Sequence, residues 1–184
     1  MKAKPTRHPG EVTLEIDRND EPLLEAANIA AASPFRLKRI LVPTDFSGCA
    51  KKALQYAIPL AKQHQAAITL LYVVPASYAV GEFGGADYAG LEAEMRLSGD
   101  AQLATLAVDE VRGEVSTDTL VRSGTPDVEI IAVAKSLPAD LIVISTHGRT
   151  GLKHVLLGSV VEHVVRRAPC PVLVVREHER EFVA

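Results

Sequence analysis

From Leu37 onward, the apolar residues of this chain follow two patterns that alternate. Short runs of branched apolar residues predict strands, and after most of them apolar residues return at three- and four-residue steps, which predicts amphipathic helices. Strands are predicted at residues 37–43, 67–74, 117–123, 139–145 and 171–176. This alternation is typical of a parallel sheet that is covered by helices.

Four helices are predicted around these strands, and their starts carry recognisable signals. Ser47 is suited to cap the first helix, in which Pro59 is expected to cause a kink. The second helix runs roughly over residues 91–112. Thr125, Pro126 and Asp127 suit the cap, the first position and the positive end of the third helix. The fourth ends before Pro169. The predicted buried stripes are Ala50, Ala53, Leu54, Ala57 and Ala61; Ile130, Val133, Ala134 and Leu137; and Val160, Val161, Val164 and Val165.

The two ends of the chain do not share this pattern. We expect a flexible N-terminal arm over residues 1–34, one domain over residues 35–177 and a C-terminal tail over residues 178–184. An alternative for part of the arm is an added strand, because Val12, Leu14 and Ile16 alternate with polar residues. Residues 75–90 contain four glycines and are predicted to form a long connection.

The composition is that of a globular protein, with 47% hydrophobic and 23% charged residues among 184. Its formal net charge of −3 gives no general reason to bind nucleic acid or an anionic membrane. The N-terminus lacks the apolar core of a signal peptide, and no apolar run approaches the roughly 18 residues of a membrane span. Two cysteines cannot make a disulfide framework. We therefore expect a cytoplasmic protein without nucleic acid or membrane partners.

The segment STHGRTGLKHVLLGS, residues 145–159, is the strongest candidate for a binding site. It follows the fourth strand and precedes a helix, and open parallel sheets bind ligands outside the carboxyl ends of their strands. Its glycines, Gly148, Gly151 and Gly158, allow the backbone to approach a ligand closely, while helix N-termini attract anions. The segment therefore predicts a phosphate site, although neither a Walker GxxxxGK[ST] nor a GxGxxG pattern is present.

Several side chains of this segment have two interpretations. Ser159 and Glu162 have capping-box spacing, so Ser159 either caps the helix or contacts phosphate. Arg149 and Lys153 either screen phosphate charge or are simply solvated. His147 either orients the loop through a ring hydrogen bond or takes part in acid–base chemistry.

The motif THG, nine residues, then GS resembles the universal stress protein family, as do ILVPTDFS before it and RAPCPVLVV after it. The resemblance covers roughly residues 36–177. The nucleotide-binding branch has the pattern G-x2-G-x9-G-[ST], which Gly148, Gly158 and Ser159 fit. Ser145 replaces the first glycine, and its side chain either crowds a nucleotide or points away from it.

The resemblance implies a flavodoxin-like fold, an open five-stranded parallel sheet of order 3-2-1-4-5 with helices on both faces. The first and fourth strands would then be neighbours. It also implies that Pro43, Thr44 and Asp45 lie at the adenosine end, with Asp45 accepting from ribose or base, and that Val73 contacts the adenine. Gly148, Gly158, Ser159 and Val160 would surround the phosphates. Independently of the resemblance, a carboxylate at a strand end suits ribose hydroxyls, although Asp45 could instead cap the helix entry.

The resulting hypothesis is a stress-response regulatory module that binds ATP, or ADP or AMP, with Mg²⁺ carried on the phosphates. The last strand, residues 171–176, would be an apolar sheet edge that pairs in a homodimer. A slow ATP hydrolase is an alternative, but it needs a positioned base and metal ligands, and Asp45 is the one evident carboxylate. A nucleotide-free dimeric scaffold is another, so we expect binding without catalysis.

Overall fold

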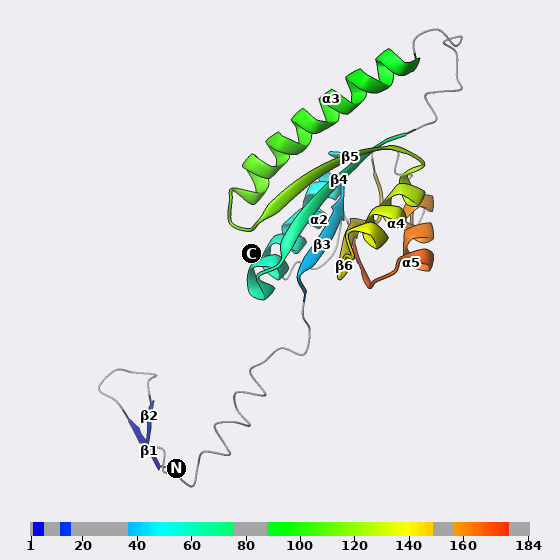
Figure 1. Cartoon of the computed structure of the whole chain (residues 1–184). Coiled ribbons are helices and arrows are strands. Elements are labelled where there is room, and N and C mark those ends of the chain that lie inside the picture. Colours follow the sequence, from blue (N-terminus) through cyan, green and yellow to red (C-terminus); the bar gives the residue numbers. More distant parts are fainter. Residues whose placement is uncertain (1, 6–11, 16–36, 76–87, 149–156, 177–184) are drawn as a thin grey trace. The chain divides into compact units, whose positions relative to one another are not determined.

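The computed structural model describes residues 2–5, 12–15, 37–75, 88–148 and 157–176, and the chain divides into two compact units, Met1–Arg36 and Leu37–Ala184. In the first unit, β1 (Lys2–Pro5) and β2 (Val12–Glu15) pair antiparallel (Figure 1). The alternating segment that begins at Val12 is thus a strand of a separate two-stranded sheet, not an addition to the larger one.

The second unit contains an open sheet of five parallel strands in the order β5-β4-β3-β6-β7. Counted within this unit, the order is 3-2-1-4-5, so the predicted flavodoxin-like fold is confirmed. The strands are β3 (Arg39–Pro43), β4 (Ala67–Pro75), β5 (Thr117–Gly124), β6 (Leu141–Ser145) and β7 (Val172–Val175).

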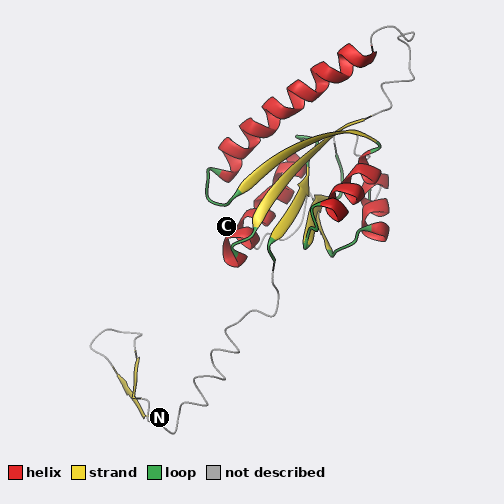
Figure 2. Cartoon of the chain, viewed as in Figure 1, coloured by secondary structure: helices red, strands yellow, loops and turns green. Residues whose placement is uncertain are grey.

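Helices cover both faces of this sheet, as Figure 2 shows. They are α2 (Gly48–His64), α3 (Tyr88–Leu106), α4 (Pro126–Ser136) and α5 (Ser159–Arg167), and a π-helical turn, η3 (Ala107–Val111), continues α3. Side chains of α2 and α3 pack against one face, and those of α4 and α5 against the other. Within the described ranges, no helix is both long and apolar enough to cross a bilayer.

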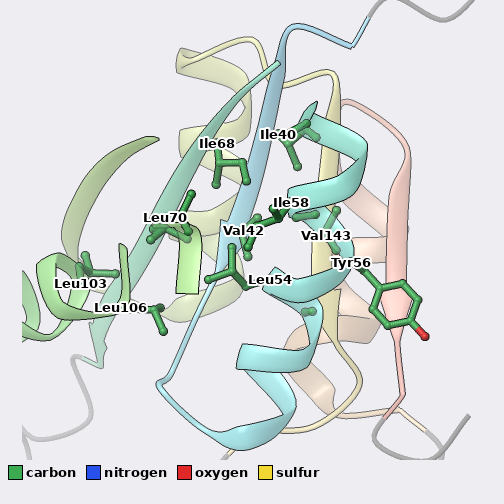
Figure 3. Close-up of a cluster of buried hydrophobic side chains, with 14 of the residues drawn as sticks. Ile40, Val42, Leu54, Tyr56, Ile58, Ile68, Leu70, Leu103, Leu106 and Val143 are labelled. Atoms are coloured by element: carbon green, nitrogen blue, oxygen red, sulfur yellow. The ribbon is translucent and has the colours of Figure 1, made fainter. Parts of the chain in front are cut away.

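Two hydrophobic clusters fill the space between the sheet and its helices, because successive strand side chains point to opposite faces. Ile40 and Val42 point into the first cluster, while Leu41 between them points into the second. Figure 3 shows the first cluster, whose labelled members are Ile40, Val42, Leu54, Tyr56, Ile58, Ile68, Leu70, Leu103, Leu106 and Val143. Burying each large apolar side chain contributes roughly 1.5–3 kcal/mol, so this double-sided core holds the strand ends in place.

The start of α2 agrees with its sequence signal, whereas two residues of the predicted stripes are exposed. Ser47 caps α2 by accepting a hydrogen bond from the Ala50 amide at 3.2 Å, and α2 continues through Pro59. Two predicted core residues were wrong, since Leu137 is 37% exposed and Val165 is 47% exposed. Leu137 lies just after α4 ends, and Val165 follows the buried Val164 by about 100° of helical rotation.

The amino edge of the sheet is fixed by Asp140. Its Oδ2 accepts hydrogen bonds from the amides of Lys38 at 2.7 Å and Arg39 at 2.9 Å. The Asp140 amide in turn donates to the Arg39 carbonyl at 2.9 Å. These bonds hold β3 and β6 in register, so that the segments that follow them emerge side by side at the carboxyl edge.

Candidate functional site

Segments that follow β3 and β6 lie at the carboxyl edge of the sheet, and each is held by a neighbouring strand. The Thr44 amide donates to the Leu71 carbonyl of β4 at 2.8 Å. The Thr146 amide donates to the Val175 carbonyl of β7 at 2.9 Å. Thr44 and Thr146 are both buried, so the two segments begin from rigid positions.

The segment after β3 is a tight turn that orients Asp45. Thr44 Oγ1 accepts a hydrogen bond from the Phe46 amide at 3.0 Å, and Asp45 Oδ1 accepts one from the Ser47 amide at 3.0 Å. Phe46 lies in the left-handed region with φ of 64°. Ser47, not Asp45, is the N-cap of α2. One carboxylate oxygen of Asp45 is therefore committed to the turn.

Ser145, at the position of the first motif glycine, has its side chain within the loop. Its Oγ donates to the His147 carbonyl at 2.9 Å, and the residue is 7% exposed. His147 Nδ1 lies 3.0 Å from Thr146 Oγ1 in a second hydrogen bond of the same loop. The Ser145 hydroxyl thus braces the segment that leads to Gly148.

Asp45 and Gly148 bring the two segments into contact. A Cβ atom built on Gly148 would lie 2.4 Å from Asp45 Oδ2 and 3.3 Å from Asp45 Cγ. The strand order explains this approach, since β3 and β6 are neighbours in the sheet. A side chain at position 148 would displace the carboxylate, so glycine is required there for Asp45 to keep its place.

The start of α5 lies beside the same loop. The Gly158 amide donates to the Thr146 carbonyl at 3.0 Å, and a Cβ on Gly158 would lie 3.1 Å from that oxygen. Gly158 is the N-cap, while Ser159 is the first helical residue and is exposed. The capping-box interpretation of Ser159 was therefore wrong, because a capping side chain must precede the helix. The N-terminal amides of α5, from Ser159 and Val160 onward, form a positive helix end that favours anions.

The remaining predicted residues are placed as follows. Pro43 is buried at the end of β3, where it pairs with Leu71 of β4. Val73 follows Leu71 by two residues, is 8% exposed and belongs to the second cluster. Arg149, Gly151 and Lys153 lie outside the described residues.

Two residues at this edge were missed by the sequence analysis. Phe46 gives no sequence signal for a left-handed backbone, because that conformation is uncommon for a residue with a Cβ. Gly124 ends β5 with φ of 152°, and it could have been found as a glycine at the end of a predicted strand.

Cys170 lies just before β7 at the opposite edge of the sheet. Burial, and then the negative charge of Asp140, raise the pKa of its thiol above the ordinary value. A thiol that stays protonated is a poor nucleophile, so Cys170 adds no chemistry to the site.

Comparison with known proteins agrees with this architecture. The model of the universal stress protein family matches residues 36–176. Universal stress protein MJ0531 of Methanocaldococcus jannaschii is 36% identical over 144 residues, which cover 78% of this chain and 85% of that protein. Universal stress protein YxiE of Bacillus subtilis is 32% identical over 161 residues, covering 75% and 98%.

Solved structures give the same result. Universal stress protein UspA from Lactobacillus plantarum is 32% identical with a TM-score of 0.64, covering 77% of this chain and 99% of its own. The protein MJ0577 is 28% identical with a TM-score of 0.70, covering 79% and 100%. The chain therefore belongs to the universal stress protein family.

Proposed function

We propose that this protein binds an adenine nucleotide at the carboxyl edge of its sheet, with ATP and Mg²⁺ as the preferred form, and acts as a stress-response regulatory module. The contact between Asp45 and Gly148 beside the N-terminus of α5 carries this proposal. It puts a carboxylate that suits ribose hydroxyls close to backbone amides that suit phosphates.

Each residue has a distinct role in this proposal. Asp45 Oδ2 accepts from the ribose, while Pro43, Thr44 and Val73 contact the adenosine. Gly148, Gly158, Ser159 and Val160 surround the phosphates. Ser145 and His147 shape the loop. For Arg149 and Gly151, which lie outside the described residues, a role at the phosphates stays a prediction. The room for a nucleotide depends on glycine at positions 148 and 158. A Cβ on Gly148 would come closer than 3.1 Å to Asp45, and a Cβ on Gly158 would lie 3.1 Å from the Thr146 carbonyl oxygen.

Two more distant proteins of the same fold support the ligand class. A universal stress protein from Archaeoglobus fulgidus was solved in complex with dAMP, with 21% identity and a TM-score of 0.53. A second universal stress protein was solved in complex with cAMP, with 22% identity and a TM-score of 0.56. In those proteins the fold accommodates an adenine mononucleotide. Mg²⁺ on the phosphates would reduce the negative charge that the site has to neutralise.

We assign Asp45 to recognition and not to activation of a water molecule. Its Oδ1 accepts from the Ser47 amide, and the proposal gives its Oδ2 to the ribose, so neither carboxylate oxygen is left to activate water. The proposed role is therefore binding without catalysis. Phosphate release by wild type and by Gly158→Val, measured over hours, tests this assignment, and equal background rates are expected.

We further propose a cytoplasmic homodimer that pairs through residues 171–176. In this part of the chain β7 is an edge strand, and its residues are all β-branched or apolar, a composition that favours pairing with another strand. Cys49 and Cys170 are not joined by a disulfide, which suits a reducing compartment. Light scattering during size-exclusion chromatography is expected to give the mass of a dimer.

Two measurements test nucleotide binding. Denatured, freshly purified protein should release ATP or ADP, which anion exchange of the supernatant detects. Calorimetric titration with ATP and Mg²⁺ should give saturable heat. An empty supernatant together with no heat would refute nucleotide binding and favour the nucleotide-free scaffold.

A further inference from the structure

Phe46 has an unfavourable backbone conformation next to Asp45. Its φ of 64° lies in the left-handed region, which glycine adopts readily and residues with a Cβ do not. Such a conformation persists only where the surroundings hold it, and it is concentrated at functional sites. Phe46 is flanked by Asp45, which contacts Gly148, and by Ser47, which caps α2.

Two kinds of contact hold Phe46 in this conformation. Its amide donates to Thr44 Oγ1 at 3.0 Å, inside the turn. Its ring packs against the first hydrophobic cluster and lies on the Tyr72 ring of β4, with centroids 4.8 Å apart and planes inclined at 44°. The turn that orients Asp45 is therefore anchored to the core by one side chain.

Tyr72 is itself held in place from the other side by α3. A Cβ on Gly99 would lie 2.6 Å from Tyr72 Cδ1 and 3.0 Å from Tyr72 Cε1, so the helix backbone approaches the ring directly. Val121 Cγ2 of β5 would lie 3.4 Å from the same Cβ on Gly99. The Tyr72 ring thus lies between Phe46 and α3, and its place is fixed by packing.

We propose that Phe46 is a positioning residue for the nucleotide. Its ring, anchored on Tyr72, holds the left-handed turn that directs the Asp45 carboxylate toward Gly148. This inference rests on the proposed function, since Asp45 is the group that would meet the ribose.

Comparison of Phe46→Ala with Phe46→Gly separates positioning from simple packing. Both variants lose the ring, but only glycine adopts the left-handed conformation without it. Phe46→Ala is expected to raise the Kd for Mg²⁺-ATP about tenfold. Phe46→Gly should bind about fivefold more tightly than Phe46→Ala, which corresponds to roughly 1 kcal/mol. If Phe46 only filled space, the two variants would have equal affinities.

A double-mutant cycle tests whether Phe46 acts through Asp45. Phe46→Ala and Asp45→Asn should be non-additive, so that Phe46→Ala changes the Kd less than twofold in the Asp45→Asn background. Affinity for Mg²⁺-tripolyphosphate, which lacks ribose and base, should be the same in wild type and Phe46→Ala. Additive effects, or an equal loss with tripolyphosphate, would overturn the inference.

A readout in the nucleotide-free protein keeps the inference separate from the proposed function. In Phe46→Ala, the amide of Ser47 should exchange with solvent several-fold faster and the Gly148 resonance should shift, with partial recovery in Phe46→Gly. Val115→Ala is the matched control, because Val115 packs on the same cluster next to the amino end of β5. Unchanged Ser47 and Gly148 amides in Phe46→Ala would overturn the inference. If wild type binds no nucleotide, the proposed function fails, and these two amides alone decide whether Phe46 positions Asp45.

Discussion

Gly148→Ala is the substitution whose effect the structure specifies most closely. The added Cβ would lie 2.4 Å from Asp45 Oδ2, about 1 Å short of an ordinary contact at 3.4 Å. Asp45 cannot retreat freely, because its Oδ1 accepts from the Ser47 amide at 3.0 Å. The φ of Gly148 lies outside the left-handed region, so alanine meets no backbone penalty there. The expected result is a folded protein in which the carboxylate is displaced.

The loss of affinity can be estimated from the bond that Asp45 is proposed to make. Hydrogen bonds to charged groups contribute about 1.5–3 kcal/mol, so losing one should raise the Kd for Mg²⁺-ATP by about tenfold to a hundredfold. Calorimetric titration measures this change. Gly48→Ala is the matched control, because no described atom lies within 4 Å of a Cβ at that position. Wild-type affinity in folded Gly148→Ala, or an equal loss in Gly48→Ala, would show that the approach of Asp45 to Gly148 does not govern nucleotide affinity.

Three further outcomes are expected. Ser145→Ala removes the hydrogen bond to the His147 carbonyl and should lower the free energy of unfolding by about 0.5–1.5 kcal/mol in urea; an unchanged midpoint would show that the bond is not made in solution. Gly99→Ala should destabilise the protein by about 1–2 kcal/mol despite the better helix propensity of alanine, since its Cβ would overlap the Tyr72 ring; a gain in thermal stability would contradict that packing. Because the folded-state pKa of Cys170 is raised, its thiol should stay protonated at neutral pH and react with iodoacetamide more slowly in the folded protein than in urea. The reaction rate of the folded protein should rise only as the pH passes the ordinary pKa of a thiol. Equal rates in the folded and unfolded states would argue against burial of Cys170. Because of the same raised pKa, the contribution of Cys170 to the free energy of unfolding is complete at a pH below the thiol pKa of the unfolded chain. This contribution is lost as the pH rises through the thiol pKa of the folded protein.

Most of the fold could be predicted because periodicity reports burial directly. The apolar run 139–145 corresponds to β6, and the stripe that includes Ala50 and Ala57 is the buried face of α2. The errors fall at helix ends, where one residue changes the direction of a side chain. Ser159 lies inside α5 and not before it, because Gly158 takes the extended conformation of the N-cap.

The candidate site could be predicted only in part from the sequence. Spacing indicated a phosphate loop near Gly148 and Gly158, but the approach of Asp45 to Gly148 depends on strand order, which the family resemblance supplied. The inward hydrogen bond of Ser145 and the left-handed φ of Phe46 depend on packing against distant residues. Such contacts cannot be predicted from local sequence patterns.

Titration of isotope-labelled wild-type protein with Mg²⁺-ATP, followed through backbone amide resonances, tests nucleotide binding at the carboxyl edge of the sheet. Saturable shifts are expected at Asp45, Gly148, Gly158 and Val160, with little change at Lys38 and Asp140 on the opposite edge of the sheet. Saturable shifts at the amino edge, or none at all at millimolar nucleotide, would contradict binding at the carboxyl edge.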